Sequence, residues 1–498
     1  MFFTKSQKQM VHKKMQKIYF ISFILSTHLF GQAFDGMTLF SPTQGGGGGG
    51  GNFITYLIDN DLSVINSWNH PRGAASMAYL LEDSTLVYPY RVQSPSMTAG
   101  GVGGGISKYN WEGDLLWSYE FADNTYQHHH DIEPLPNGNI LVIVWEKKTA
   151  SEAYAVGRQS IDNSLNEIWA EALLEVEPVG TNDVNIAWEW HIWDHLIQDA
   201  DSVLPNFGVI AEHPELQDVN YGNAGSNNGP GGPNGDWKHL NAVDYHPELD
   251  QIVISSRHHD EFYIIDHSTT TEEASGHTDG NSGMGGDYLY RWGNPQAYDR
   301  GTNSDHLLAG QHGVNWIPEG YPGEGNLILF NNNYGNNTAA VFEIVPPLNE
   351  NGNYTISPNQ PFGPNNPTWF HAGNFHTQMQ GGAFRLPNGN TFITDCDDAM
   401  MFEVTENHDV VWSHDYGGTQ YFIARAQKYS MDYLGGGFPD FTVGDVNFDG
   451  ILDLLDMIYM LDMASGNGYA PTPPADFNGD GSVTITDVIL FLQYIINN

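Results

Sequence analysis

Histidines and one arginine stand at the two ends of a short predicted strand pair. His239 and Asn241 open this stretch, an apolar alternation over residues 250–256 has the period of a half-buried strand, and Arg257 and His258 follow it. Arginine offers a planar fork of N–H donors and histidine a donor or a nucleophilic nitrogen, so these ends are suited to holding a small anion. Taken alone, the stretch also fits a surface strand with a solvated tip.

Two further histidines share one position relative to a turn. His130 precedes Asp-Ile-Glu-Pro-Leu-Pro-Asn-Gly and His312 precedes Gly-Val-Asn-Trp-Ile-Pro-Glu-Gly, while His239 enters the equivalent strand of the unit between them. If equivalent strands line one channel, the three rings converge, with Arg257 on the following strand. Three converging histidines could hold zinc or copper. The fixed cation of Arg257 would repel a metal and favours a sulfate, phosphate or carboxylate instead.

The elements that must position these residues belong to a repeat between about residues 53 and 430. Six units read as an apolar strand, a turn and a strand that in most copies carries a tryptophan. Five others read as a strand, a Pro/Asn/Gly turn and a strand, as in Leu135-Pro-Asn-Gly-Asn-Ile-Leu-Val. A degenerate sixth copy at 419–430 would pair with the first unit and close a ring. This pattern predicts an all-β, six-bladed β-propeller in residues 34–440, with a pair of β-sandwiches as the alternative.

The interval 170–238 is too long for one blade. It contains the aromatic run 188–195 and a Gly/Asn/Pro-rich loop over 221–236. Long loops in compact domains are frequently functional. We expect an insertion that forms a lid or rim over one face of the ring. Its tryptophans would be a platform for an apolar substrate or, equally well, would pack the insertion itself.

The composition is strongly acidic, with a formal charge of −42 at neutral pH. This balance argues against nucleic acid or an anionic membrane as partner. Lysines and the apolar run 18–26 precede small residues ending at Ala33, which predicts a signal peptide over 1–33 and a secreted protein; an uncleaved anchor is the alternative. The glycines at 45–51 lack the Lys and Ser/Thr of a phosphate-binding loop, so no nucleotide cofactor is expected.

The C-terminal residues 441–498 read as a separate calcium-binding module. Two acidic loops place oxygen ligands at positions 1, 3, 5, 9 and 12, with glycine at position 6, as in an EF-hand, and each leads into an apolar helix, 454–464 or 486–496. Solvated acidic turns are the alternative. The expected calcium ligands are Asp445, Asn447, Asp449, Asp453, Asp456, Asp476, Asn478, Asp480, Thr484 and Asp487. Two such loops resemble a type I dockerin, and this resemblance implies a cohesin-like protein as a partner.

Four motifs together resemble the bacterial arylsulfate sulfotransferase family. They are HHD before LPNGN, HLN before SSRH, QHG, and RLPNGNT, and the resemblance covers about residues 34 to 430. It implies a secreted propeller that moves a sulfuryl group between phenols without a nucleotide. By motif, His312 would be the nucleophile, and His130, His239 and Arg257 would bind the sulfuryl oxygens. Substrate contacts would come from Asn241, His129 and His258. The single Cys396 departs from well-known members, which carry a disulfide.

Two function classes therefore stand side by side. One is an aryl sulfotransferase that takes a phenolic sulfate donor and a phenol acceptor and carries a calcium-binding appendage. The other is a secreted propeller of the same descent that binds a sulfated or acidic polysaccharide without turnover. Only the first class predicts release of phenol from an aryl sulfate.

Overall fold

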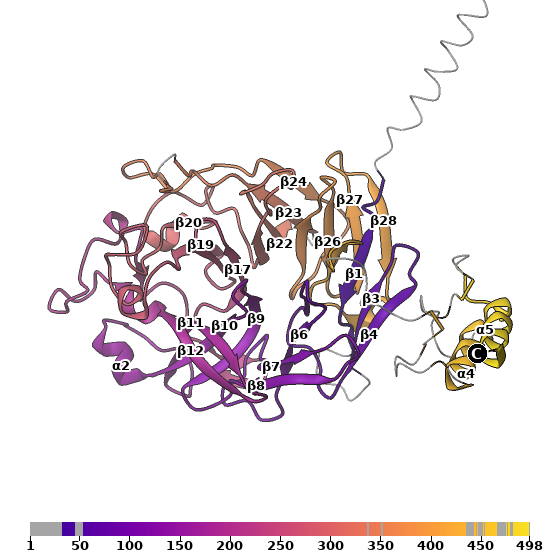
Figure 1. The fold of residues 1–498 in the computed structure, drawn as a ribbon. Coiled ribbons are helices and arrows are strands. Elements are labelled where there is room, and N and C mark those ends of the chain that lie inside the picture. The colour runs from indigo at the N-terminus through magenta and orange to yellow at the C-terminus, as the bar shows by residue number, and fades with distance from the viewer. Residues whose placement is uncertain are drawn as a thin grey trace, which may run out of the picture.

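The computed structural model describes residues 32–44, 53–335, 338–349 and 352–434. In the C-terminal part it describes 443, 444, 446, 452, 454–465, 475, 477, 478 and 482–497. Six four-stranded antiparallel sheets follow one another around a central channel (Figure 1). The protein is therefore mainly β and has the architecture of a six-bladed propeller, as the repeat predicted.

Each blade runs from an inner strand beside the channel to an outer edge strand. The first three blades are β30 (Gln427–Ser430), β1 (Gly36–Phe40), β3 (Phe53–Ile58), β4 (Val64–His70); β5 (Tyr79–Leu80), β6 (Leu86–Arg91), β7 (Gly104–Tyr109), β8 (Leu115–Glu120); and β9 (Tyr126–Pro134), β10 (Ile140–Thr149), β11 (Glu167–Val179), β12 (Asp183–His191). The others are β17 (Leu240–His246), β18 (Gln251–Ser256), β19 (Glu261–Asp266), β20 (Tyr290–Trp292); β21 (His312–Trp316), β22 (Leu327–Gly335), β23 (Thr338–Ile344), β24 (Trp369–Ala372); and β25 (Gly382–Arg385), β26 (Thr391–Asp395), β27 (Met400–Val404), β28 (Val410–Asp415).

The ring closes by pairing the two ends of the propeller chain. β30 forms the inner strand beside β1, with Met37 opposite Tyr429. The closure is as predicted, but residues 419–430 supply one blade strand rather than two, because β1 takes the second position. The short β29 (Tyr421–Phe422) pairs instead with β2 (Thr43–Gln44) outside the blades.

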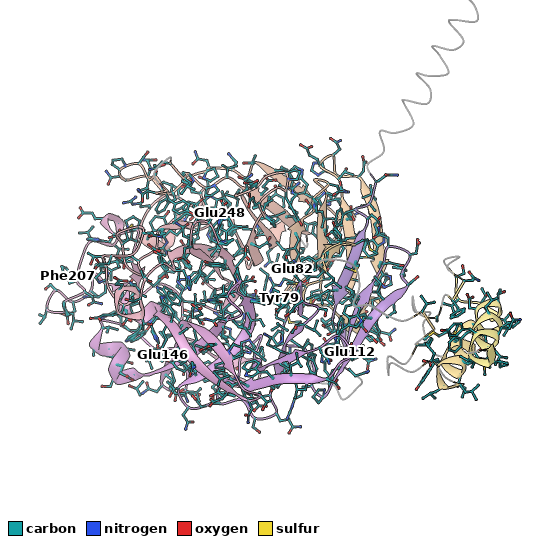
Figure 2. All side chains as sticks on the ribbon, viewed as in Figure 1. Tyr79, Glu82, Glu112, Glu146, Phe207 and Glu248 are labelled. Atoms are coloured by element: carbon teal, nitrogen blue, oxygen red, sulfur yellow. The ribbon has the colours of Figure 1, made fainter. Side chains whose placement is uncertain are left out.

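Figure 2 shows side chains throughout the ring, and the buried apolar ones form clusters between neighbouring blades. The largest cluster lies between the third and fourth blades and includes Leu173, Trp190, Leu240 and Tyr263, all fully buried. Alternation along each strand sends successive side chains to the two faces of its sheet, and the preceding and following blades cover one face each. This packing holds the inner strands rigidly around the channel.

The expected insertion begins later than the sequence indicated. Residues 170–179 and 183–191 lie in β11 and β12, so the segment outside the blades starts at 192. Trp188 and Trp190 are buried between blades, and their indole N–H groups donate to Thr269 Oγ1 and Gly286 O. They pack the fold and offer no platform to a substrate, because the strand period of β12 turns them into the core.

The segment 192–238 carries little regular structure. It contains the parallel pair β13 (Leu196–Ile197) and β14 (Gln217–Asp218) and the hairpin β15 (Ser226–Gly229) and β16 (Gly232–Asn234). Short helices elsewhere are α2 (Ala150–Ala155) and α3 (Thr271–Ala274), each with a capping box at its N-terminus.

The C-terminal part holds two helices, α4 (Leu454–Ser465) and α5 (Ile485–Asn497), close to the predicted ranges. Met460, Val488 and Phe491 are buried in a small apolar cluster of this part. The predicted ligands Asp445, Asn447, Asp449, Asp453, Asp476 and Asp480 lie outside the described residues, as does nearly all of the predicted signal peptide. Among the described helices, none is both long and apolar enough to cross a membrane.

Candidate active site

A cavity of about 660 Å³ opens at one end of the channel. Its lining includes His130, His239, Arg257, His258 and His312 from three successive blades, together with residues 222–236 of the segment outside the blades. The volume is in the range of small-molecule sites. The rings of His130 and His239 meet edge to face, with centroids 4.5 Å apart. The structure thus brings together the residues that the sequence placed on equivalent strands.

A β-bulge in each of the inner strands β9, β17 and β21 lies beside these side chains. The register shifts between Val142 and Val144 opposite β9, between Leu240 and Ala242 in β17, and between His312 and Asn315 in β21. His130 and His239 have left-handed backbones, with φ of 54° and 56°. Such a conformation costs about 1–3 kcal/mol for a residue other than glycine and is concentrated at functional sites. The shared bulge explains why the three histidines take equivalent positions and all face the cavity.

The ring of His312 is held in one tautomer by Asn332. Both amide hydrogens of Asn332 are used, because Nδ2 lies 3.0 Å from Thr377 O and 2.8 Å from Gln380 O. The amide oxygen therefore accepts, and it lies 2.8 Å from His312 Nδ1. Nδ1 must carry the hydrogen, which leaves the lone pair on Nε2, the nitrogen without a partner among the described residues. Burial, with the nearby charge of Arg257, lowers the pKa of His312 to about 3, so the ring is neutral.

His130 is the end of a buried hydrogen-bonded chain. Its Nδ1 lies 2.9 Å from Nδ1 of His129, whose Nε2 lies 2.8 Å from Glu171 Oε2. The ring of His129 also stacks on that of Trp145, with centroids 4.0 Å apart. Burial, reinforced by the negative charge of Asp236, raises the pKa of Glu171 well above its usual range, which favours the protonated carboxyl. A protonated Glu171 donates to His129, His129 donates to His130, and His130 then presents an Nε2–H to the cavity.

His239 is oriented by a carboxylate. Its Nδ1 lies 2.5 Å from Asp236 Oδ2, and its ring stacks on His258 with centroids 4.7 Å apart. Burial acts to raise the pKa of Asp236, but the rings of His239 and His258 outweigh burial and hold this pKa below its ordinary value. Asp236, His239 and His258 are also close enough to share a metal ion. Arg257 in the same cavity disfavours a cation there.

Arg257 brings its guanidinium to the wall of the cavity. Its backbone N–H donates to His239 O at 3.1 Å, which ties together the two strand ends. No described residue accepts a hydrogen bond from its guanidinium, which lines the cavity beside His312. A guanidinium with unused donors at a cavity wall is suited to an oxyanion.

Two predicted substrate contacts are corrected. His129 does not line the cavity, because it lies behind His130 in the chain that ends at Glu171. Asn241 does not line it either; its side-chain amide donates to Gln311 O at 2.6 Å and so supports the residue before His312. Both side chains position the cavity histidines from behind. Both residues lie where the register of the strand pair shifts, and a bulge there interrupts the regular alternation of inward and outward side chains.

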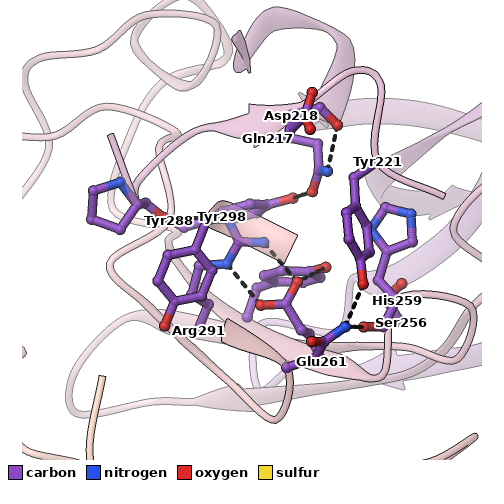
Figure 3. Close-up of polar contacts among 12 residues, drawn as sticks. Gln217, Asp218, Tyr221, Ser256, His259, Glu261, Tyr288, Arg291 and Tyr298 are labelled. Atoms are coloured by element: carbon purple, nitrogen blue, oxygen red, sulfur yellow. Dashed lines mark hydrogen bonds and ion pairs between the residues drawn. The ribbon is translucent and has the colours of Figure 1, made fainter. Parts of the chain in front are cut away.

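A buried polar cluster anchors the strand that carries His239. Lys238 Nζ donates to Gln217 Oε1 at 2.5 Å and to the Tyr263 hydroxyl at 2.7 Å. Behind them, Arg291 binds Glu261 through two hydrogen bonds of 2.9 and 2.6 Å (Figure 3). Breaking a buried pair of this kind leaves an unpaired charge and strongly destabilises a protein. The cluster therefore fixes the backbone that presents His239 to the cavity.

Asn332, Asp236 and Glu171 are functional candidates that the sequence analysis missed. Asn332 could have been found, because it comes shortly after the apolar run Leu327–Phe330 of β22, much as Arg257 comes shortly after the apolar run of β18. Asp236 lies three residues before His239, a spacing too common to stand out. Glu171 is far from His129 in sequence, and no local pattern links them.

Comparison with protein families adds the decisive observation. The family model described as arylsulfotransferase (ASST) matches residues 91–345, just over half of the chain. The chain belongs to the arylsulfotransferase family. The matched range contains His130, His239, Arg257 and His312, so the cavity of this arylsulfotransferase-family chain is built mainly within it. None of the curated proteins compared with the chain matches it.

Three solved structures are similar to this chain at low sequence identity. A Bacteroides caccae protein of unknown function is 11% identical with a TM-score of 0.41, covering 79% of this chain and 98% of its own. The periplasmic gluconolactonase of Pseudomonas aeruginosa is 11% identical with a TM-score of 0.36, covering 79% and 99%. Virginiamycin B lyase of Staphylococcus aureus is 10% identical with a TM-score of 0.31, covering 76% and 83%. The fold assignment rests on the six sheets themselves.

Proposed function

We propose that this protein transfers a sulfuryl group from a phenolic sulfate ester to a phenol, without a nucleotide, through a covalent sulfohistidine at His312. The observation that carries the proposal is the hydrogen bond between His312 Nδ1 and Asn332 Oδ1. It leaves the Nε2 lone pair of a neutral imidazole at a cavity that also holds the guanidinium of Arg257, with which no described residue pairs. A nucleophile beside a preplaced cation is what attack on a sulfate ester requires.

In the first half-reaction, Nε2 of His312 attacks sulfur, the N–S bond forms and the S–O bond to the aryl group breaks. The sulfurylated ring keeps its hydrogen on Nδ1 and is therefore cationic. Asn332 Oδ1 accepts a hydrogen bond from this N–H. A cationic ring is a good leaving group, so the oxygen of a second phenol can attack sulfur and release neutral His312. The same histidine thus serves as nucleophile and as leaving group.

The departing phenoxide needs a proton, and His130 supplies it. As the Nε2 hydrogen of His130 moves to phenoxide, the hydrogen of His129 Nδ1 moves to His130 and that of Glu171 moves to His129 Nε2. Glu171 becomes a carboxylate and the phenol leaves neutral. The acceptor phenol returns its proton along the same chain in the second half-reaction. The resting state is restored without a proton from solvent.

Arg257, His239 and His258 would hold the sulfuryl oxygens, where negative charge is concentrated during transfer. Phe422, Met379 and Pro230 also line the cavity, and their apolar side chains suit the aryl ring of donor and acceptor. Apolar lining of this kind favours phenols over sugars or nucleotides as the substrate class.

The test is a burst experiment with a chromogenic aryl sulfate and no acceptor. Wild-type protein should release about one phenol per chain, because the covalent intermediate accumulates. The peptide that contains His312 should gain one SO₃ unit. His312→Ala should lose both signals while keeping its thermal melt. Absence of phenol release from wild-type protein over a range of donors would support the polysaccharide-binding alternative.

We also propose that the protein is secreted and that calcium folds its C-terminal part. Asp456 and Asp487, at position 12 of the two loops, are fully buried. Asp456 accepts the Val446 N–H at 2.8 Å, and Asp487 accepts the backbone N–H groups of Asn478 and Thr484 at 3.1 and 2.8 Å. Buried carboxylates that accept hydrogen bonds from the backbone of their own loops fit an oxygen-ligand calcium site. A cohesin-like protein is the partner that such a module would take.

A further inference from the structure

A second cluster of metal-ligand side chains lies outside the cavity, where the segment 192–238 begins. His195 Nδ1 lies 2.7 Å from Asp287 Oδ1, and His277 Nδ1 lies 2.8 Å from the same oxygen. The three ligand atoms are within 4.8 Å of one another. His195 and Asp287 are buried, whereas the side chain of His277 is 58% exposed. The cluster is thus closed toward the protein and open toward solvent.

The hydrogen bonds of His195 determine which of its nitrogens can bind a ligand. Nε2 lies 2.9 Å from Ala274 O, and a carbonyl oxygen can only accept, so Nε2 carries a hydrogen. In the neutral ring, Nδ1 then directs a lone pair at a carboxylate oxygen. Two acceptors 2.7 Å apart require a cation between them, either a proton or a metal ion.

The surroundings are built closely around this ring. A side chain on Gly286 would come within 2.7 Å of His195 Nε2, and Trp190 stacks on the ring with centroids 5.8 Å apart. A histidine that donates its second N–H to a backbone carbonyl is the usual arrangement of a metal-bound imidazole, because that bond fixes the tautomer and the ring orientation.

We propose that His195, His277 and Asp287 bind a zinc ion. Two imidazoles and one carboxylate form a donor set that zinc favours, with ligand distances of about 2.0–2.2 Å. A modest opening of the cluster on its exposed His277 side accommodates the ion. The fourth position faces solvent and takes a water molecule. The ion replaces the proton between His195 and Asp287, so binding releases protons.

The site would link the segment 192–238, whose later residues form the rim of the cavity, to the propeller. His195 belongs to the segment whose later residues, 222–236, line the cavity, and its carbonyl accepts the Gln217 N–H at 2.8 Å. Gln217 in turn accepts from Lys238, which precedes His239. Asp287 lies three residues before Tyr290, where β20 of the fourth blade begins. One ion would therefore link the start of the rim to a blade through a short chain of contacts.

The test uses the full chain, stripped of metal and then kept in excess calcium so that the C-terminal loops are saturated. Titration with Zn²⁺ should show one equivalent bound per chain, with proton release and a rise in Tm. Co²⁺ should give the visible bands of a four-coordinate site. His277→Ala should weaken zinc binding by at least about 100-fold, since loss of a supporting contact alone costs up to that much.

Two variants separate this site from others. His213→Ala removes an exposed histidine of the same segment, paired with Glu215 at 2.8 Å, and should bind zinc as wild type does. His258→Ala removes the metal-capable group of the cavity and should also leave zinc binding unchanged. Zinc uptake that survives His277→Ala, or that is lost with His258→Ala, would overturn the proposal. So would a wild-type protein that takes up no zinc.

Discussion

Replacement of Glu171 by glutamine tests the proton chain without removing its hydrogen bonds. In Glu171→Gln, the amide N–H₂ can donate to His129 Nε2 where the protonated carboxyl did, at 2.8 Å in the native chain. The amide oxygen can still accept the Leu240 N–H, which lies 3.1 Å from Glu171 Oε1. His130 would still present an Nε2–H to the cavity. Glutamine has no transferable proton. The Nε2–H of His130 could therefore donate a hydrogen bond to phenoxide, but the proton itself could not be transferred.

The size of the effect should depend on the leaving phenol. General acid catalysis contributes about 10²–10⁴ in rate, or about 3–5 kcal/mol of activation free energy. Phenyl sulfate, whose phenoxide is a strong base, should therefore react about 10²–10⁴ times more slowly in Glu171→Gln. A nitrophenyl sulfate, whose phenoxide is weakly basic, should react at nearly the wild-type rate. The slope of log(kcat/KM) against the pKa of the leaving phenol should become steeper.

The assay is the rate of phenol release over a series of substituted phenyl sulfates. Glu175→Gln is the matched control, because Glu175 lies on the same strand and pairs with His267 at 2.9 Å, away from the cavity. It should leave the slope unchanged. An equal loss of rate for every donor in Glu171→Gln would show a purely structural role and refute the proton chain, as would no loss for any donor.

Three further predictions concern the charges of the site and of the tail. Arg257→Lys should lower turnover by about 10²–10³ with an unchanged melt, because lysine lacks the planar fork of donors; unchanged turnover would remove Arg257 from oxyanion binding. Because burial lowers the pKa of His312 to about 3, the burst rate with a nitrophenyl sulfate should show no loss near pH 6.5 from protonation of the nucleophile; a His312-dependent loss there would contradict a buried neutral ring. Chelation of calcium should unfold the C-terminal helices and leave the main transition of the propeller in place, as followed by calorimetry; loss of both transitions would argue against two separate units.

Some features of the site are set by local sequence alone. The Leu-Pro-Asn-Gly-Asn hairpin and its relatives set a turn wherever they occur, and their spacing counted the blades correctly. Because His130 and His312 precede such turns by the same number of residues, their convergence on one channel followed from strand geometry. Repetition explains this success, since every copy of the repeat carries the same information about its place in the ring.

The roles of the polar partners of the site could be assigned only in the folded chain. Asn332 selects the tautomer of His312 and Glu171 supplies the chain behind His130, yet both reach their histidines through lateral pairing of strands. The bulges where His129 and Asn241 lie are likewise properties of paired strands. The start of the segment outside the blades was misjudged because β12 is a long edge strand, where Trp188 and Trp190 look like a loop platform until the next blade covers them.

The sequence by itself thus determined the number of blades, the closure of the ring and the histidines and arginine that face one cavity. These depend on periods of two residues and on turns, which act over short stretches of chain. The tertiary structure decided which nitrogen of each histidine faces the cavity, because a tautomer depends on the hydrogen-bond partner of the other nitrogen. Asp236 lies only three residues before His239. Asn332 and Glu171 come from other strands, 20 and 42 residues from His312 and His129, and only the packed ring brings them within 3 Å of these histidines.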